Sequence, residues 1–526
     1  MIKKLLKLIQ EALNKMFEKE DINEALNINS TIISEPLTNA IEKWRQMYKD
    51  ESPWLDEKNG VYSLGLAKQI CREIQQQVLS EIDTRIVEPG MEGEVEQDKN
   101  IDINSTRATY LNEIYTRRFL DKLSETVEKA LALGGMIVKP YFSNNQIYFD
   151  YCYQGEFYPI KFDEDGNIID IAFYDTFIAG GYVYTKIERQ EFDCTTNTIT
   201  VVNKAYKAKQ KSKDDETEQD LGNEIQLTDV PQWAGLEDEV TINNVEKPLY
   251  GYFKIPTANN IDLKSPLGVS IFSPATKLIQ RADEQFSRLD WEYKGGQLAI
   301  DVDPTAVTYS ETYFKTDIEM DDCQRRLYRK LDLGSDETYN AWAPNLRDAN
   351  YINGLNAYKC LIEDAIGISR GTISEPAYDA KTATEIKLSK QRSYITISAI
   401  QDSLEKAIMD IVYSMNVLVD LYNLAPAGDY DTIVEWKDSI LTDTDTELTQ
   451  KLLLEKEGIL SKAEVRAWYN GESLKTAQAE IDKMKKEKQK NMLNDIYGNL
   501  PSATLENNGE DDETSGEKQT KQEEEE

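Results

Sequence analysis

Apolar residues in the first part of the chain recur at steps of three and four, the period of an α-helix with one buried face. This pattern predicts helices over residues 2–17, 35–50, 64–84 and 105–133, and Gly134-Gly135 ends the last of them. The 2–17 helix is amphipathic, so it either packs on its own chain, which we favour, or binds a membrane surface or a partner.

From about residue 136 the period changes to that of β-strands. Segments rich in Val, Ile, Tyr and Phe alternate with turn residues as far as about residue 255, and Asp165-Gly166 is a hairpin turn signal. Five lysines in 204–213 run directly into acidic residues. They predict a solvated, mobile loop in preference to a phosphate-contacting patch.

Beyond the β-rich region, helices predominate again. Ser273-Pro274 forms an N-cap and N1 pair for a helix that ends at Gly295-Gly296 and is about 30 Å long. Strand-like segments LAIDVDP and RRLYRKLDL follow, and then comes a second helix, about 350–366. The expected buried faces of these two helices are Leu278, Ala282, Phe286, Leu289 and Tyr293, and Leu355, Tyr358, Ile362 and Ala365.

Residues 367–382 contain two glycines and Pro376 and predict a loop. Residues 383–424 contain neither Gly nor Pro and predict a helix of roughly 60 Å. Its expected buried face is Ile397, Ile400, Leu404, Ile408, Ile411, Met415, Leu418 and Tyr422. A polar joint at 425–446 leads to a helical block, 446–497, and the last 21 residues, with ten acids, predict a disordered tail. The fold class expected is α+β, mainly helical.

Composition argues against catalysis. The chain has no histidine, which removes Ser-His-Asp, Cys-His and His-zinc chemistry. It has no GxxxxGK[ST], no GxGxxG after a strand and no GxSxG. Its five cysteines form no CxxC pair, and no apolar run reaches eighteen residues, so we expect no disulfide framework, no zinc site and no transmembrane helix. We therefore predict a protein that is not an enzyme and uses no cofactor or metal.

The formal net charge of −35 bears on nucleic acids as partners. Tight DNA binding normally needs a basic field, so weak equilibrium binding to duplex DNA is expected. DNA as a sliding cargo is compatible with this charge, because a channel lining must hold DNA loosely.

Three segments in order resemble the portal proteins of tailed phages, particularly siphoviruses that infect Gram-positive bacteria. They are SPLGVSIFSPATKLIQRADEQFSRLDWEYKGGQ at 265–297, DAIGISRGTISEPAYDAKTATEI at 364–386 and EGILSKAEVRAWYNG at 457–471. The resemblance implies a ring, usually of twelve subunits, that encloses a DNA tunnel. The alternatives are another virion structural protein, such as a scaffold or adaptor, and a carboxylate-based enzyme.

The resemblance also implies a division of the chain. It assigns a wing to 1–264, a stem helix to 265–296, a clip to 297–347, a second stem helix to 348–367, a tunnel loop to 368–382, the long wing helix and joint to 383–445, a crown to 446–500 and the disordered acidic tail to 501–526. The partners implied are double-stranded DNA, terminase, the head–tail adaptor, and the major capsid and scaffold proteins, with no membrane. The location implied is the portal vertex of the virion, after assembly in the host bacterial cytoplasm.

Two sets of residues are candidate contacts. In the tunnel loop the expected exposed, DNA-facing side chains are Ser369, Arg370, Thr372, Ser374, Glu375, Tyr378, Asp379 and Lys381, and deletion of 372–379 is expected to remove no core residue. The alternative is a surface loop unrelated to DNA. In the clip, Arg325, Arg326, Arg329 and Lys330 form a basic cluster that either docks terminase or adaptor, or makes salt bridges between subunits.

Overall fold

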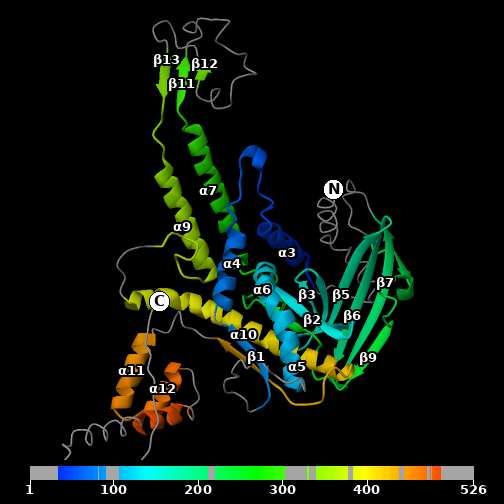
Figure 1. The fold of residues 1–526 in the computed structure, drawn as a ribbon. Helices are drawn as coiled ribbons and strands as arrows, with labels where there is room; N and C mark the ends of the chain where they lie inside the picture. The colour runs from blue at the N-terminus through cyan, green and yellow to red at the C-terminus, as the bar shows by residue number, and fades with distance from the viewer. Residues whose placement is uncertain are drawn as a thin grey trace, which may run out of the picture. The chain divides into compact units, whose positions relative to one another are not determined.

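The computed structural model describes residues 33–80, 82–89, 106–210, 220–302, 328–330, 339–376, 383–436, 444–470, 474 and 477–486 (Figure 1). The predicted helix at 2–17 and the tail at 501–526 lie outside these residues. The chain divides into two compact units, residues 1–92 with 98–442, and residues 93–97 with 443–526. Both helices and sheets are present, consistent with the predicted α+β class.

The helices expected near the start of the first unit are confirmed in most of their extent. They are α3 (Glu35–Tyr48), α4 (Leu66–Leu79), α5 (Arg107–Ile114) and α6 (Asp121–Leu133), with a π-helical turn, η2 (Tyr115–Leu120), between the last two. A short 3₁₀ turn, η1 (Glu57–Asn59), lies between α3 and α4. The predicted helix 64–84 is wrong at its end, because Ile82–Val87 forms β1 and pairs antiparallel with β14 (Asp431–Trp436), which lies in the predicted polar joint.

The β-rich region is confirmed as two antiparallel sheets. The first has the order β10-β2-β3, from β2 (Gly135–Ser143), β3 (Gln146–Tyr153) and β10 (Gly251–Lys254). The second has the order β4-β5-β6-β7-β8, with β9 also on β7. Its strands are β4 (Phe157–Phe162), β5 (Ile168–Ala179), β6 (Tyr182–Asp193), β7 (Thr198–Lys209), β8 (Asn223–Ile225) and β9 (Glu239–Asn243), and η3 (Leu227–Asp229) follows β8.

Two local predictions in this region had different outcomes. The turn at Asp165-Gly166 does join antiparallel strands β4 and β5. The loop predicted over 204–213 is wrong for 204–209, because these residues end strand β7. Ala205 and Ala208 are buried there by pairing with β6, and a run of lysines does not reveal that pairing.

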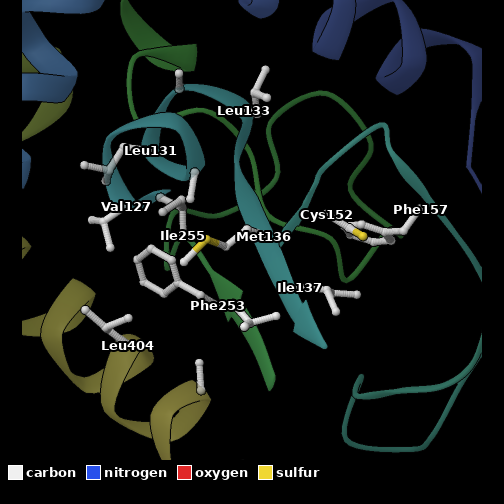
Figure 2. Close-up of a cluster of buried hydrophobic side chains, with 14 of the residues drawn as sticks. Val127, Leu131, Leu133, Met136, Ile137, Cys152, Phe157, Phe253, Ile255 and Leu404 are labelled. Atoms are coloured by element: carbon white, nitrogen blue, oxygen red, sulfur yellow. The ribbon is translucent and has the colours of Figure 1, made fainter. Parts of the chain in front are cut away.

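The core of the first unit lies where the first sheet meets α6 and the long helix α10 (Ala383–Leu421). Figure 2 shows Leu404 of α10 facing Phe253 of β10, with Val127 and Leu131 of α6 beside them. The 39 residues of α10 correspond to about 58 Å, as predicted. Its predicted buried face is confirmed from Ile397 to Leu418. Tyr422 is the exception: it follows the helix, is 44 % exposed and stacks on Phe142.

Helices α7 (Thr276–Gly295) and α9 (Asp348–Ile366) pack against each other (Figure 1). Ser273-Pro274 opens a 3₁₀ turn, η4 (Ser273–Ala275), so the α-helix starts later than predicted. The predicted face of α9 is wrong at its end, where Ala365 is exposed and Ile366 is buried.

The predicted buried face of α7 is only partly right, because a loop from far earlier in the chain covers a neighbouring face. Ala282 is buried and Leu278 is half-buried against the core, but Tyr293 is exposed. Asp283 accepts hydrogen bonds from Trp54 Nε1 (2.9 Å) and the Leu64 N–H (2.8 Å), and Ser287 Oγ accepts one from the Tyr62 N–H (2.9 Å). The buried residues of α7 are therefore Ile279, Ala282, Asp283 and Ser287.

Between α7 and α9 in sequence lies a small sheet with the order β12-β11-β13. Strand β11 (Ala299–Val302) is parallel to β12 (Tyr328–Lys330) and antiparallel to β13 (Tyr339–Trp342). Both strand-like segments predicted here are confirmed, and β13 was not predicted.

The second unit contains α11 (Thr444–Lys456) and α12 (Lys462–Asn470), as the helical pattern predicted. Ser461 and Glu464 form a capping box at the start of α12. The Glu464 N–H donates to Ser461 Oγ (3.2 Å), and the Ser461 N–H donates to Glu464 Oε2 (2.6 Å). Across the described part of the chain, no helix is long and apolar enough to cross a membrane.

Candidate functional site

Of the predicted loop, the structure describes residues 367–376, which form a turn that follows α9. Gly367 ends α9 in the left-handed conformation (φ +89°), with its N–H on the Glu363 carbonyl at 3.0 Å. A Cβ at Gly367 would also lie 2.8 Å from Thr396 Oγ1. The position therefore favours glycine for two separate reasons.

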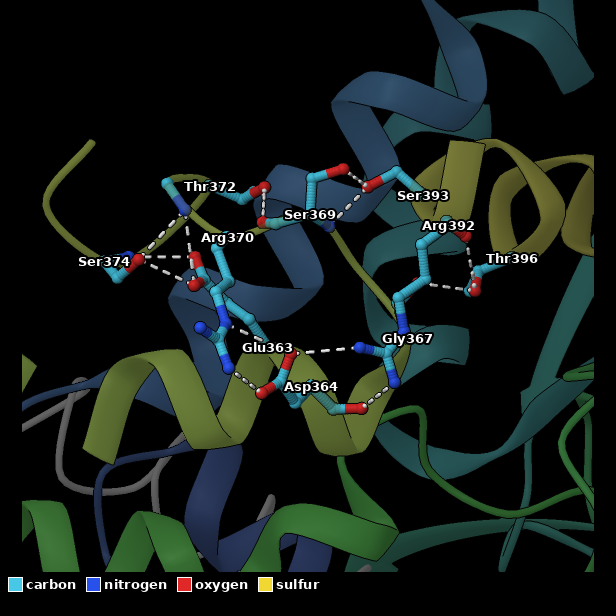
Figure 3. Close-up of polar contacts among 11 residues, drawn as sticks. Glu363, Asp364, Gly367, Ser369, Arg370, Thr372, Ser374, Arg392, Ser393 and Thr396 are labelled. Atoms are coloured by element: carbon cyan, nitrogen blue, oxygen red, sulfur yellow. Dashed lines mark hydrogen bonds and ion pairs between the residues drawn. The ribbon is translucent and has the colours of Figure 1, made fainter. Parts of the chain in front are cut away.

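A buried carboxylate organises this turn. Glu363 is 0 % exposed, and Figure 3 shows its side chain among the turn residues. Its Oε1 accepts the Ile373 N–H (2.7 Å) and the Ser374 N–H (3.0 Å), and its Oε2 accepts the Ser374 hydroxyl (2.6 Å) and the Gly371 N–H (3.3 Å). A buried charge needs this many donors to offset its desolvation, so the turn is folded around Glu363.

Helix α10 holds the other side of the turn. Thr396 Oγ1 donates to the Gly367 carbonyl at 2.8 Å. Ser393 Oγ accepts the Ser369 N–H at 2.6 Å and donates to Ser369 Oγ at 2.9 Å. These contacts tie the turn to a helix that belongs to the core.

An arginine–aspartate–arginine group joins this turn to α9 and α10 (Figure 3). Asp364 forms ion pairs with Arg370 (Nη2–Oδ2 2.6 Å) and with Arg392 of α10 (Nη1–Oδ1 3.0 Å). Arg392 Nη2 also donates to the Asp364 backbone carbonyl at 2.8 Å. The Arg370 hydrogen bond holds the pKa of the Asp364 carboxyl below its usual value, so this carboxyl stays ionised.

The predicted loop residues differ in burial. Arg370 and Glu375 are exposed, as expected, and Ser369 and Thr372 are half-buried. Ser374 is only 6 % exposed, so the prediction of exposure is wrong there, because its hydroxyl bonds to Glu363. Tyr378, Asp379 and Lys381 lie outside the described residues.

The expectation that residues 372–379 contain no core residue is also wrong. Ile373 is 5 % exposed and belongs to the main hydrophobic core. A deletion of this segment would remove both Ile373 and donors to Glu363.

The predicted basic cluster is only partly described. Arg329 and Lys330 lie on strand β12. Arg325 and Arg326 lie outside the described residues. Docking of a partner by this cluster stays a prediction.

Five residues of this site were not predicted from the sequence: Glu363, Asp364, Arg392, Ser393 and Thr396. In a chain with 95 acidic residues, nothing in the sequence distinguishes Glu363 from an exposed glutamate. Within the residues that the structure describes, no group of three or more Cys, Asp or Glu side chains could hold a metal ion.

Comparison with protein-family models matches most of the chain to a known family. Residues 92–492 match the family described as phage portal protein, SPP1 Gp6-like. The matched range includes the helix pair α7 and α9, the small sheet between them in sequence, and the turn around Glu363. A comparison with curated proteins gave no match.

Proposed function

The chain belongs to the phage portal protein family of the SPP1 Gp6-like type, whose members are structural proteins of the virion, and from this membership we propose its assembly and its role. Copies of the chain form a ring, of twelve subunits as the resemblance implies, at one vertex of the capsid. Double-stranded DNA enters and leaves through the hole of this ring. The match over residues 92–492 is the observation that carries the proposal.

Exposed apolar side chains on the α7–α9 pair support lateral packing of subunits. Trp291 and Tyr293 near the end of α7 are 73 % and 42 % exposed, and Ile352 and Leu361 on α9 are 41 % and 48 % exposed. Trp291 also borders an open hollow of about 700 Å³ that residues 58–62 line. Exposed apolar side chains on a pair of packed helices favour a protein partner, and in a ring that partner is a second copy.

Charge and motifs support a passive conduit. With a net charge of −35 the chain is expected to bind DNA weakly, which suits a channel in which DNA slides. The sequence carries no P-loop motif, so the ATPase that drives packaging is a separate protein, the terminase.

We assign the regions as the resemblance implies, with the turn after α9 at the tunnel and the sheet β12-β11-β13 in the clip. The clip docks terminase during packaging and the head–tail adaptor afterwards, and its basic cluster is the candidate contact. Charge reversal of Arg325 and Arg326 should leave rings intact and stop packaging or head completion. Rings that fall apart would instead favour salt bridges between subunits.

Electron microscopy of the purified full-length chain tests the ring. Twelve chains of 60.2 kDa give a particle of about 720 kDa with a central hole. Trp291→Glu should reduce ring formation without unfolding the subunit, because this side chain is already exposed. The matched control is Leu263→Glu, at a loop residue that is 89 % exposed and lies outside α7 and α9. A wild-type chain that stays monomeric with scaffold or capsid protein present would contradict the proposal.

A further inference from the structure

The group formed by Asp364, Arg370 and Arg392 has more positive than negative charge, in a chain that is strongly acidic overall. Both guanidinium groups are directed at the one Asp364 carboxylate. The Arg370 and Arg392 side chains are nevertheless 63 % and 55 % exposed, whereas the Asp364 side chain is 28 % exposed. The arginines are therefore accessible to a ligand while they are paired.

The surrounding sequence has the same local bias. From residue 370 to residue 392 there are five lysines and arginines and three acidic residues, although the whole chain has 60 basic and 95 acidic residues. This stretch runs from the turn into the first part of α10. Glu363 is buried and Asp364 is less exposed than either arginine, so an anion that approaches the turn meets chiefly the two guanidinium groups.

A guanidinium group binds a carboxylate and a phosphate with the same planar arrangement of N–H donors. An exposed ion pair contributes little net free energy, so its exchange for another anion has a low cost. Asp364 accordingly occupies the position that a phosphate oxygen would take between the two arginines.

We propose that Arg370 and Arg392 bind the phosphate backbone of duplex DNA, and that Asp364 competes with that phosphate for the same guanidinium groups. This inference rests on the proposed function, because the turn must face DNA. The competition makes each contact weak and quickly reversible. The arginines guide a passing strand and then return to the Asp364 carboxylate as the strand leaves.

The turn does not depend on Asp364 for its shape. Glu363 binds the backbone of Gly371, Ile373 and Ser374, and Ser393 binds that of Ser369. Arg392 also bonds to the backbone carbonyl of residue 364, a contact that Asp364→Asn retains. This variant therefore removes the competing charge and leaves the arginines in place.

The test measures binding of a short fluorescent DNA duplex to the full-length protein by anisotropy, over a range of NaCl concentrations. Asp364→Asn should tighten binding, roughly threefold to tenfold for the loss of two exposed ion pairs. Arg370→Gln and Arg392→Gln should each weaken it. Each should also reduce the slope of log K against log salt by about 0.9 for every phosphate that the variant no longer neutralises.

The matched control is the exposed pair Glu113–Arg117, which joins α5 to η2 at 2.9 Å. Glu113→Gln and Arg117→Gln make the same charge changes away from the turn, and they should alter DNA binding much less. If the control pair has equal effects, binding follows net charge and the inference is wrong. If Asp364→Asn and Arg392→Gln shift binding in the same direction, the group is only structural and the inference is also wrong.

A second arm identifies the source of the phosphate. Inorganic phosphate is added at matched ionic strength. If low millimolar phosphate binds the wild type more tightly than Arg392→Gln while the duplex binds the two proteins equally, the site takes a free anion and the assignment to the DNA backbone is wrong. Electron microscopy of the same samples tests the ring separately, so intact rings with unchanged DNA binding would overturn this inference alone.

Discussion

Replacement of Glu363 by glutamine should loosen the turn after α9 while it keeps the size of the side chain. The carboxylate accepts two backbone N–H groups on Oε1, and one further N–H and the Ser374 hydroxyl on Oε2. The amide keeps one acceptor oxygen and places an NH₂ group where Oε2 was. The Ser374 hydroxyl can rotate to accept from that NH₂, but the Gly371 N–H is left with Ser374 Oγ alone, at 2.9 Å.

The magnitude follows from the change in charge. A hydrogen bond to a charged group contributes about 1.5–3 kcal/mol and one between neutral groups about 0.5–1.5 kcal/mol. In Glu363→Gln the two hydrogen bonds to Oε1 change from charged to neutral, and the Gly371 N–H on the Oε2 side loses one acceptor. Together these changes should cost about 2 kcal/mol, after allowance for the lower desolvation cost of an amide. That free energy corresponds to roughly a 30-fold larger opening equilibrium constant for the turn.

Hydrogen exchange followed by mass spectrometry measures this directly on peptides that cover residues 363–376. Exchange in Glu363→Gln should be faster by about that factor at the amides of Gly371, Ile373 and Ser374, with little change in α6 or β2. Glu375→Gln is the control, because it removes a charge from an exposed residue of the same turn. Equal protection in wild type and Glu363→Gln, or an equal effect of Glu375→Gln, would refute this reasoning.

Two further predictions concern the β-rich region. The Glu188 carboxylate is 14 % exposed and bonds to Lys139 Nζ at 2.8 Å, so Lys139→Met leaves it with the more distant Lys186 as its cation and Gln190 as a neutral donor. Thermal unfolding should show a loss of about 3 kcal/mol. Burial opposes ionisation of Glu188, but the two lysines outweigh it and lower its pKa to about 2, so the stability from this group is complete above pH 4.5 and is lost as the pH falls toward 2. Between pH 4.5 and pH 2 the melting temperature of Lys139→Met should therefore fall less than that of the wild type. Gly268→Ala should lower the melting temperature strongly, because its Cβ would lie 2.1 Å from the Gly134 carbonyl oxygen, whereas Gly235→Ala, with open space around it, should not.

The sequence by itself determined the elements whose burial follows a regular period. The apolar positions of α10 from Ile397 to Leu418 recur with helical spacing, and seven of the eight predicted face residues are buried. The strands of the β-rich region and the hairpin at Asp165-Gly166 could also be predicted, because local strand propensity and turn residues agree there. The order of these elements also carried the resemblance to portal proteins, which the family match supports.

Only the tertiary structure decided which polar side chains are buried. The face of α7 was predicted only in part, because Asp283 and Ser287 are covered by a loop whose Leu64 lies 219 residues before Asp283. The first three residues of strand β1 were predicted as helix because its partner, β14, lies at the other end of the unit. Hydrophobic periodicity records apolar faces, but the burial of a charged side chain such as Glu363 depends on donors that only the folded chain brings to it.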